Sequence, residues 1–462
     1  MWQRRHLRHC KYCDWCCYTV AETEEGETSV MAENTREIVL DVLLSLEKGE
    51  DFSHRLLKNV LDKYDYLDSR DKAFIKRVTE GTLERQLELD YYLNHFSSVP
   101  VRKMKPLIRC LLRMSVYQIV YMDAIPDSAV CNEACKLAGK RKFQNLKGFV
   151  NGVLRNIAKK KAELPLPDRK KNLTEFLSVK YSMPLWIVKL WLDEYGSEGT
   201  EKILEGLLRI HPVSLRFRTT LSGEEREGLI AEMKGRGVTV NQSEYLPYIY
   251  TVDSVDGIGN LPGFETGKIT VQDVSSALAL EAAGIKDTDF VMDICAAPGG
   301  KSILAAEKAS KVLSRDVSEA KVAMIEENLE RMQVTNVKTQ VFDATDTDEE
   351  YIETADVLLM DVPCSGLGVM GKKRDIKYHA SPEGLESIME LQRKIISSSW
   401  RYVKPGGVLL YSTCTIHRGE NEDRVRWICE KFPFEQEESK QLLPGFMECD
   451  GFFFARLRRK KD

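Results

Sequence analysis

Two cysteines stand where reactive groups gather in α/β enzymes. Cys364 lies in residues 361–365 (Asp-Val-Pro-Cys-Ser), and Cys414 lies in residues 412–415 (Ser-Thr-Cys-Thr). Each cysteine follows an apolar run that predicts a buried strand, and ligands and chemistry gather outside the carboxyl ends of such strands. Two thiols at that place, one of them beside the carboxylate of Asp361, predict covalent chemistry on an electrophilic carbon.

The elements that would position these cysteines lie in residues 268–462. Apolar runs alternate there with helical patterns, which is typical of a parallel sheet with helices between its strands. We therefore expect a Rossmann-like α/β domain. Its expected strands include residues 290–294, 312–316, 338–342, 357–360 and 407–411.

The first expected strand runs directly into a loop of small residues, 295–302, which opens a helix. Backbone N–H groups in such a loop bind nucleotide-like ligands. The Gly-Lys-Ser at the end of the loop also matches a phosphate-binding P-loop, so an NTPase is one hypothesis. It is weakened because Cys295 stands where that motif begins with glycine, and because Pro298 has no N–H to donate.

The next two expected strands end at acidic residues. Asp316 stands about where a Rossmann-like domain binds ribose hydroxyls, and Asp343 follows the third strand, where it is placed for an adenine edge. A small-residue loop and two acids at successive strand ends predict a pocket for an adenosine without phosphates. This pattern points to S-adenosylmethionine.

Composition sets limits on the class of protein. The 462 residues carry a formal net charge of −4, so any nucleic-acid surface must be local. No apolar stretch is long enough to span a bilayer, and the twelve cysteines are best interpreted as reduced thiols of a cytoplasmic protein. We expect five of them to be buried small hydrophobes, namely Cys110, Cys131, Cys135, Cys429 and Cys449.

Residues 1–33 form a segment of their own. Four cysteines and two histidines there resemble metal-ligand spacing, but no second pair follows at a regular interval. We therefore interpret this segment as a disordered extension or a start assigned too early, with Met31 as the working start, and expect no metal. The residues concerned are His6, His9, Cys10, Cys13, Cys16 and Cys17.

Residues 34–162 carry helical periodicity throughout and predict one all-α domain. Its last third holds a run of basic residues without an acid between them. Such a run is either a solvated face or a patch that contacts RNA phosphates. The candidates for RNA contact are Lys140, Arg141, Lys142 and Lys147.

Residues 163–267 predict linker helices followed by a small α/β unit resembling an RNA-recognition motif. Residues 213–218 alternate apolar and polar side chains, as a half-buried strand does. Arg216 and Arg218 would project from one face of that strand, where they either contact RNA or keep the strand soluble.

Three motifs resemble those of the RNA cytosine-5 methyltransferases of the Nol1/Nop2/Sun group. The front domain resembles the NusB-like RNA-binding domain at residues 69–71 and 148–155. This pairing is similar to the layout of the Sun (RsmB-type) enzymes, which implies methylation of a bacterial 16S ribosomal RNA cytosine, position 967. The three motifs are residues 293–301, 361–366 and 411–415, with supporting matches at 271–273, 374–377, 421–422 and 450–453.

The resemblance implies a role for each site residue. Cys414 would be the nucleophile that adds to C6 of the cytosine, and Asp361 would hydrogen-bond at N3 and the exocyclic amine. Cys364 would assist the final elimination that frees the product. The residues implied to hold S-adenosylmethionine are Cys295, Ala296, Ala297, Pro298, Gly299, Gly300, Lys301, Asp316, Asp343 and Asp361.

Cys414 needs activation, because the thiolate is the reactive form of cysteine. Either Lys301 or Lys377 would supply the positive charge. His379 and His417 are near the site in sequence and are either structural or solvent-facing. The target base must leave its stack to be reached. The expected partner is 16S rRNA or a small-subunit assembly intermediate, bound by a monomer without a metal or a membrane.

Two other functions stay open at this point. One is a transfer-RNA cytosine-5 methyltransferase of similar fold, against which the NusB-like domain speaks. The other is a non-catalytic RNA-binding assembly factor, against which the joint presence of Cys364, Cys414, Asp361 and the glycine loop speaks.

Overall fold

The computed structural model describes residues 34–49, 52–209, 212–253, 255 and 257–461. The cysteine- and histidine-rich segment of residues 1–33, with its expected lack of structure and metal, lies outside the described residues. Within the described ranges, no group of three or more metal-ligating side chains occurs. In the same ranges, no helix combines the length and apolar character that a membrane span requires.

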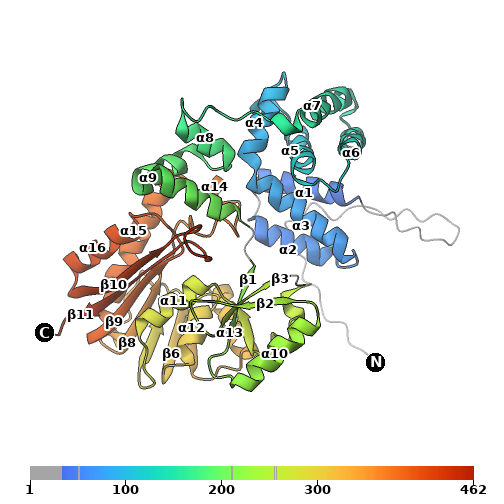
Figure 1. Cartoon of the computed structure of the whole chain (residues 1–462). Coiled ribbons are helices and arrows are strands. Elements are labelled where there is room, and N and C mark those ends of the chain that lie inside the picture. The colour runs from blue at the N-terminus through green and yellow to red at the C-terminus, as the bar shows by residue number, and fades with distance from the viewer. Residues whose placement is uncertain (1–33, 50–51, 210–211, 254, 256, 462) are drawn as a thin grey trace, which may run out of the picture. The chain divides into compact units, whose positions relative to one another are not determined.

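The front of the chain forms a helical domain around α5 (Figure 1). Most of the inward side of α5 is apolar, with Leu111, Leu112 and Ile119 fully buried, as expected for a helix surrounded by others. The all-α expectation for this part is confirmed. Its helices are α1 (Thr35–Glu47), α2 (Ser53–Lys63), α3 (Ser69–Glu84), α4 (Gln86–Phe96), α5 (Pro106–Tyr121), α6 (Asp127–Lys140) and α7 (Lys147–Lys159).

Two helices link this domain to the rest of the chain, α8 (Leu173–Lys180) and α9 (Leu185–Leu208). Helix α9 is kinked at Gly196, which has a φ of 69°. The fully buried Trp191 of α9 belongs to an apolar cluster that includes Leu367 and Ile416 from the loops after the two cysteines. The linker helices therefore pack directly against the loops that carry the thiols.

A small α/β unit follows, and its fourth strand lies beyond residue 267, where the middle segment was expected to end. Its sheet is antiparallel in the order β2-β3-β1-β4, and α10 (Gly223–Gly235) begins with a capping box formed by Ser222 and Glu225. Its likeness to an RNA-recognition motif stays a prediction. The strands are β1 (Val213–Phe217), β2 (Thr239–Gln242), β3 (Ile249–Asp253) and β4 (Ile269–Val271).

The prediction that Arg216 contacts RNA is wrong. Its side chain is fully buried, with Nη1 2.7 Å from Glu307 Oε1 and Nε 2.6 Å from Gln272 Oε1. Both faces of β1 are covered, so Arg216, a polar residue of the alternating strand, meets the Glu307 carboxylate inside the protein instead of solvent. The half-buried Arg218 donates from Nη1 to the carbonyl of Met332 at 3.0 Å.

The C-terminal part is built on a seven-stranded sheet in the order β10-β11-β9-β8-β5-β6-β7. All its strands run parallel except β11, which is antiparallel to both of its neighbours. The expected Rossmann-like α/β domain is confirmed. The strands are β5 (Phe290–Asp293), β6 (Lys311–Asp316), β7 (Val337–Val341), β8 (Ala355–Asp361), β9 (Val403–Thr413), β10 (Phe434–Leu442) and β11 (Phe452–Arg459).

Helices cover both faces of this sheet (Figure 1). Val291 of β5 and Leu359 of β8 belong to the apolar cluster on one face of the sheet. Their chain neighbours Met292 and Leu358 belong to the cluster on the other face, because successive side chains of a strand alternate. The helices are α11 (Val274–Ala283), α12 (Gly300–Ala306), α13 (Glu319–Arg331), α14 (Ile376–His379), α15 (Pro382–Ser399) and α16 (Glu422–Lys431). Single 3₁₀ turns occur at Val101–Lys103, Gln144–Leu146, Lys161–Glu163, Ile258–Asn260, Glu349–Tyr351 and Trp400–Tyr402.

Candidate active site

The two cysteines meet at the carboxyl edge of the sheet. Their loops follow β8 and β9, which are adjacent and parallel, with Asp361 in register with Ser412. The two loops therefore leave the sheet side by side, and the Sγ atoms of Cys364 and Cys414 lie 3.2 Å apart. Both line a pocket of about 490 Å³.

Asp361 ends β8 and is held from two sides. Its Oδ1 accepts from Ser412 Oγ at 2.9 Å, and its Oδ2 lies 2.6 Å from Lys301 Nζ. The carboxylate side chain is still 31% exposed. It is therefore fixed beside Cys414 while it keeps open surface toward a ligand.

The surroundings separate the two thiols. The pKa of Cys414 is lowered by its hydrogen bond with Cys364, and the charges of Lys373 and Lys301 act in the same direction against burial. The pKa of Cys364 is raised well above its ordinary value by that shared hydrogen bond, by burial and by the charge of Glu420. Of the two thiols, Cys414 is therefore the one whose ionisation the surroundings favour.

The two lysines proposed to activate Cys414 have different positions. Lys301 stands at the site, paired with Asp361. Lys377 is buried elsewhere, where its Nζ donates to the carbonyls of Glu84 and Ser182 at 2.7 and 2.6 Å, and burial lowers its pKa to about 7. Sequence reasoning missed Lys373, whose only signal was its place in a short basic run before Asp375.

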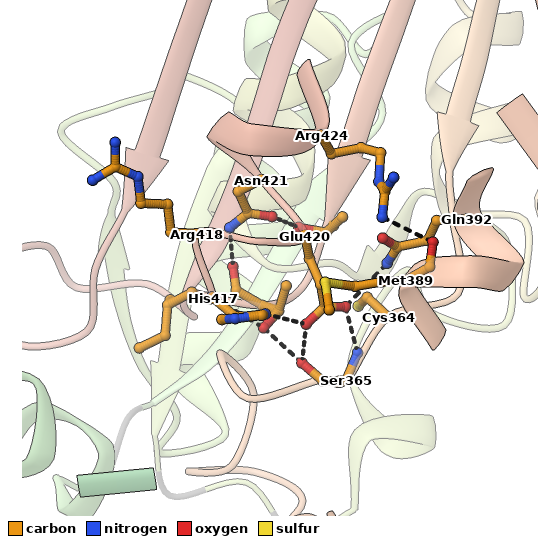
Figure 2. Close-up of polar contacts among 12 residues, drawn as sticks. Cys364, Ser365, Met389, Gln392, His417, Arg418, Glu420, Asn421 and Arg424 are labelled. Carbon is orange, nitrogen blue, oxygen red and sulfur yellow. Dashed lines mark hydrogen bonds and ion pairs between the residues drawn. The ribbon is translucent and has the colours of Figure 1, made fainter. Parts of the chain in front are cut away.

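A buried carboxylate joins the loops of the two cysteines (Figure 2). Glu420, six residues beyond Cys414, is fully buried. It accepts from the backbone N–H of Ser365 at 2.9 Å, from the Ser365 hydroxyl at 2.5 Å and from Gln392 Nε2 at 3.0 Å. Because Ser365 follows Cys364 directly, Glu420 fixes one loop to the other. Sequence reasoning did not select this residue.

Asn421 holds the strand end on either side of Cys414 (Figure 2). Its Oδ1 accepts from Thr413 Oγ1 at 2.6 Å, and its Nδ2 donates to the Thr415 carbonyl at 3.1 Å. The residues before and after the nucleophile candidate are thus bound to one amide side chain, which restricts the movement of the Cys414 sulfur.

The two histidines lie at different depths. His417 is buried, with Nδ1 3.5 Å from Glu420 and Nε2 3.8 Å from Glu194. Burial lowers its pKa, but the nearby carboxylates of Glu420 and Glu194 favour the protonated ring and outweigh this, so the net pKa is raised. His379 is 44% exposed and lines the pocket of the cysteines. His417 therefore contacts the buried carboxylates next to the site, whereas His379 lines the pocket itself.

The small-residue loop lies between β5 and α12, as expected. Gly299 has a φ of +100°, and a side chain there would press on Ile325. The pKa of Cys295 is raised by burial and by three nearby carboxylates, which disfavour its thiolate. Asp293 below the loop accepts from Ser302 Oγ at 2.7 Å, and burial raises its pKa to about 7.

The two predicted cofactor acids stand at the same edge. Asp316 is 4% exposed and accepts from the backbone N–H of Ala297 at 2.9 Å, which ties it to the loop. Asp343 is exposed and accepts from the N–H and hydroxyl of Thr345 at 2.9 and 2.8 Å, which lower its pKa. The structure therefore gathers the loop and both acids as expected.

The basic run of the helical domain is partly neutralised. Arg141 pairs with Asp41 at 2.6 Å and Glu37 at 3.0 Å, and Lys140 pairs with Glu37 at 2.5 Å. Lys142 is exposed, and Lys147 is half-buried. RNA binding by these residues stays a prediction. Of the five cysteines expected in cores, Cys110, Cys131 and Cys449 are buried, and Cys135 and Cys429 are half-buried.

Two family models match the chain. The model described as "16S rRNA methyltransferase RsmB/F" matches residues 280–458, and the NusB family model matches residues 33–159. The first covers the seven-stranded sheet and both cysteines. The second covers helices α1 to α7 of the helical domain.

Curated relatives match over nearly their whole length. The chain is 34% identical to "Probable ribosomal RNA small subunit methyltransferase B" of Bacillus subtilis, with 92% of this chain and 99% of the relative covered. It is 29% identical to "Ribosomal RNA small subunit methyltransferase B" of Cronobacter sakazakii, with 90% and 96% covered.

Solved structures share the fold. The crystal structure of PH0851 matches with a TM-score of 0.76 and 26% identity, over 92% of this chain and 99% of that one. A structure of NSun6 from Pyrococcus horikoshii with SFG matches with a TM-score of 0.52 and 23% identity, over 59% and 97%. The two family models and the near-complete match to the Bacillus relative show that the chain belongs to the RsmB/F family of 16S rRNA methyltransferases and carries an N-terminal NusB domain.

Proposed function

We propose that this RNA methyltransferase transfers a methyl group from S-adenosylmethionine to C5 of one cytosine of 16S rRNA, position 967, through a covalent adduct at Cys414. The observation that carries the proposal is the pair of sulfurs 3.2 Å apart beside Asp361, with opposite pKa shifts. The expected setting is the cytoplasm, with 16S rRNA or an assembly intermediate bound by a monomer.

The residues at the ends of β5, β6 and β7 fit S-adenosylmethionine better than a nucleoside triphosphate. Asp343 brings exposed negative charge to this edge, and the lysines nearby are engaged, Lys321 with Asp316 at 2.9 Å and Lys301 with Asp361 at 2.6 Å. A triphosphate would meet repulsion there, whereas a sulfonium cation would not. When bound, S-adenosylmethionine supplies an electrophilic methyl group. The residues that would hold it are 295–301, Asp316 and Asp343.

The chain's own residues account for the activation of the base. The Cys414 thiolate forms a bond to C6 of the extruded cytosine, and the electron pair of the C5–C6 double bond moves onto the ring. The charge that develops there is negative: a proton delivered to N3 through Asp361 neutralises it, while the other carboxylate oxygen accepts from the exocyclic amine. C5 thereby becomes nucleophilic toward a methyl group.

The second thiol serves the release of the product. After methylation, the proton on C5 must leave so that the C6–S bond to Cys414 breaks and the double bond re-forms. Cys364 is 3.2 Å from the Cys414 sulfur. It is placed to assist this elimination: Cys364 first loses its own proton to solvent, and its thiolate then takes the C5 proton while the electron pair of the C6–S bond returns to the Cys414 sulfur.

The test is methyl transfer from labelled S-adenosylmethionine to unmodified 16S rRNA, with mapping of the labelled base. Cys414→Ser should abolish transfer, and Cys364→Ala should accumulate a covalent protein–RNA adduct visible on a denaturing gel. Cys429→Ala, half-buried on α16, is the control and should behave as the wild type. Label on transfer RNA instead of 16S rRNA would overturn the substrate, and normal turnover by Cys364→Ala would overturn its role.

A further inference from the structure

The pocket of the two cysteines has a wall from the helical domain. Besides Cys364, Cys414 and residues of the loop after β8, it is lined by Phe52, His54 and Arg55, which lie at the start of α2. These residues are more than three hundred positions before the cysteines in the chain. The front domain therefore contributes side chains to the space in front of the reactive sulfurs.

The start of α2 is fixed in this position by the catalytic domain. The backbone N–H of Ser53, one of the helix-terminal donors without a partner inside the helix, donates to Asp375 Oδ2 at 2.6 Å. A carboxylate at a helix N-terminus is also favoured by the helix dipole. The Phe52 ring meets the His379 ring edge-on, with centroids 5.4 Å apart.

The segment that carries Asp375 is attached to the helical domain on its other side. Arg374 lies 2.7 Å from Glu80 and 2.9 Å from Glu84 of α3. Lys377 donates to the carbonyl of Glu84 at 2.7 Å. The contacts of Arg374, Asp375 and Lys377 fix α2 and α3 to the loop after Cys364. The wall is therefore a fixed part of the pocket.

The chemistry of the wall suits a nucleic-acid strand. Arg55 and the exposed Lys373 supply positive charge, while Phe52 and His379 supply flat rings. The Oδ1 atom of Asp375, a residue 3% exposed, has no hydrogen-bond partner among the described residues and is an acceptor for an amino or hydroxyl donor. Cations and aromatic rings together are how proteins bind unpaired nucleotides.

We propose that the start of α2 is part of the RNA site and binds the nucleotide next to the reacting cytosine. Phe52 packs against the base of that neighbour, and Arg55 with Lys373 binds the adjoining phosphates. The volume of about 490 Å³ exceeds the need of a single pyrimidine, which leaves room for this neighbour. The inference rests on the proposed function, because it names residues for the substrate of the same site.

The experiment measures equilibrium binding of unmodified 16S rRNA to the full-length protein over a range of salt concentrations. Phe52→Ala should weaken binding roughly fivefold or more, as loss of a base-stacking ring does. Arg55→Ala should also lower the slope of log affinity against log salt by about one, as loss of one phosphate contact does. Binding of S-adenosylmethionine, measured by calorimetry, should stay unchanged in both variants.

Matched controls come from the same region. Lys58→Ala removes an equal charge from the exposed side of α2, and Tyr66→Ala removes a 65% exposed ring just beyond it. Neither residue lines the pocket, so both variants should bind RNA as the wild type does. Equal losses from Lys58→Ala and Arg55→Ala, or wild-type binding by Phe52→Ala and Arg55→Ala, would overturn the proposal.

Failure of the function and failure of the inference give different results. If the wild type transfers no methyl group to 16S rRNA, the proposed function is wrong, and the binding measurements still decide the role of α2. If transfer occurs and the α2 variants match their controls in RNA affinity and in its salt dependence, the proposed function stands and the inference is wrong.

Discussion

Ser365 donates both its backbone N–H and its hydroxyl to Glu420, at 2.9 and 2.5 Å. Two hydrogen bonds from one residue to one buried carboxylate restrict the movement of the Cys364 loop relative to the Cys414 loop. Neither Ser365 nor Glu420 belongs to the cysteine pair, but we expect this connection to help set the sulfur–sulfur distance of 3.2 Å.

Glu420→Gln tests that connection. The amide keeps the size of the side chain, but it loses the charge and presents N–H groups to at least one of the donors now bound. We expect release of the product to slow at least tenfold, since a hydrogen bond to a charged group contributes about 1.5–3 kcal/mol. The covalent adduct should accumulate in a single-turnover gel assay.

The control for this variant is Glu430→Gln, an exposed position on α16. It should turn over normally. Unchanged adduct levels in Glu420→Gln, with S-adenosylmethionine bound as in the wild type, would remove Glu420 from the positioning of Cys364.

Lys301→Met should make the Cys414 thiol less acidic. Loss of the ammonium removes a charge that lowers the pKa of Cys414 and leaves Asp361, which raises that pKa, without its partner. The pKa therefore moves up, and the thiolate forms only at higher pH. Rates of iodoacetamide alkylation at Cys414, followed by mass spectrometry against pH, should shift to the alkaline side.

Lys404→Gln is the matched change at the opposite end of the sheet, where Lys404 pairs with Asp356 at 2.7 Å. Its alkylation profile should coincide with that of the wild type. A shift of the Lys301→Met profile toward lower pH would contradict the assignment of Lys301 as an activating charge.

Arg216→Met should destabilise the fold and leave RNA contacts untouched. The variant leaves the carboxylate of Glu307, 2% exposed, buried without its cation. Breaking a buried ion pair in this way costs about 3–5 kcal/mol. The free energy of unfolding, measured by urea titration, should fall by an amount of that order. The fall should be somewhat smaller than the full value, because the hydroxyl and N–H of Thr219 also donate to Glu307 and still stabilise its carboxylate.

The double variant Arg216→Met with Glu307→Leu should recover part of the loss, because no charge is then left buried. RNA affinity of the folded Arg216→Met protein should equal that of the wild type. A lower affinity with unchanged stability would restore Arg216 as an RNA contact.

Asp293 makes stability depend on pH. Burial raises the pKa of Asp293 to about 7, above its ordinary 3.8, so the native state holds this proton to higher pH than the unfolded chain. Its contribution to stability is therefore full below the ordinary pKa and is lost as the pH rises through about 7. The loss approaches about 1.4 kcal/mol for each pH unit between the two values.

Asp293→Asn removes this titration, so its free energy of unfolding should fall less than that of the wild type between about pH 5 and pH 8. Asp287→Asn, at an exposed position before β5, is the control and should retain the wild-type slope. Parallel curves for Asp293→Asn and the wild type would show that Asp293 is ionised in both states.

The strands and the candidate site residues at their ends could be predicted from the sequence, because each of these residues ends or follows an apolar run. The positions of Asp316, Asp361 and Cys414 at the carboxyl ends of parallel strands follow from strand geometry alone. Arg216 was misassigned for a related reason. Period-two alternation predicts which face a residue occupies, but not whether a second layer, here Glu307 after α12, covers that face.

Residues that act through distant partners could not be predicted from the sequence. Lys377 lies near Cys364 in the chain, yet its hydrogen-bond acceptors include the Glu84 carbonyl, 293 positions away. Glu420 carries no local pattern, and only its burial against Ser365 and Gln392 reveals what it does. Contacts of this kind depend on how whole domains pack, which no short motif encodes.

The place of β11 in the sheet affects the order in which the sheet can be completed during synthesis. β11 lies between β9 and β10 and bonds to both, yet it is made after them. Until residues 452–459 leave the ribosome, β9 ends the sheet as an open edge, and β10 has no neighbour to pair with. The strand that leads to Cys414 thus gains its second neighbour only from a segment made after it, and until then its edge is open to pairing with other chains.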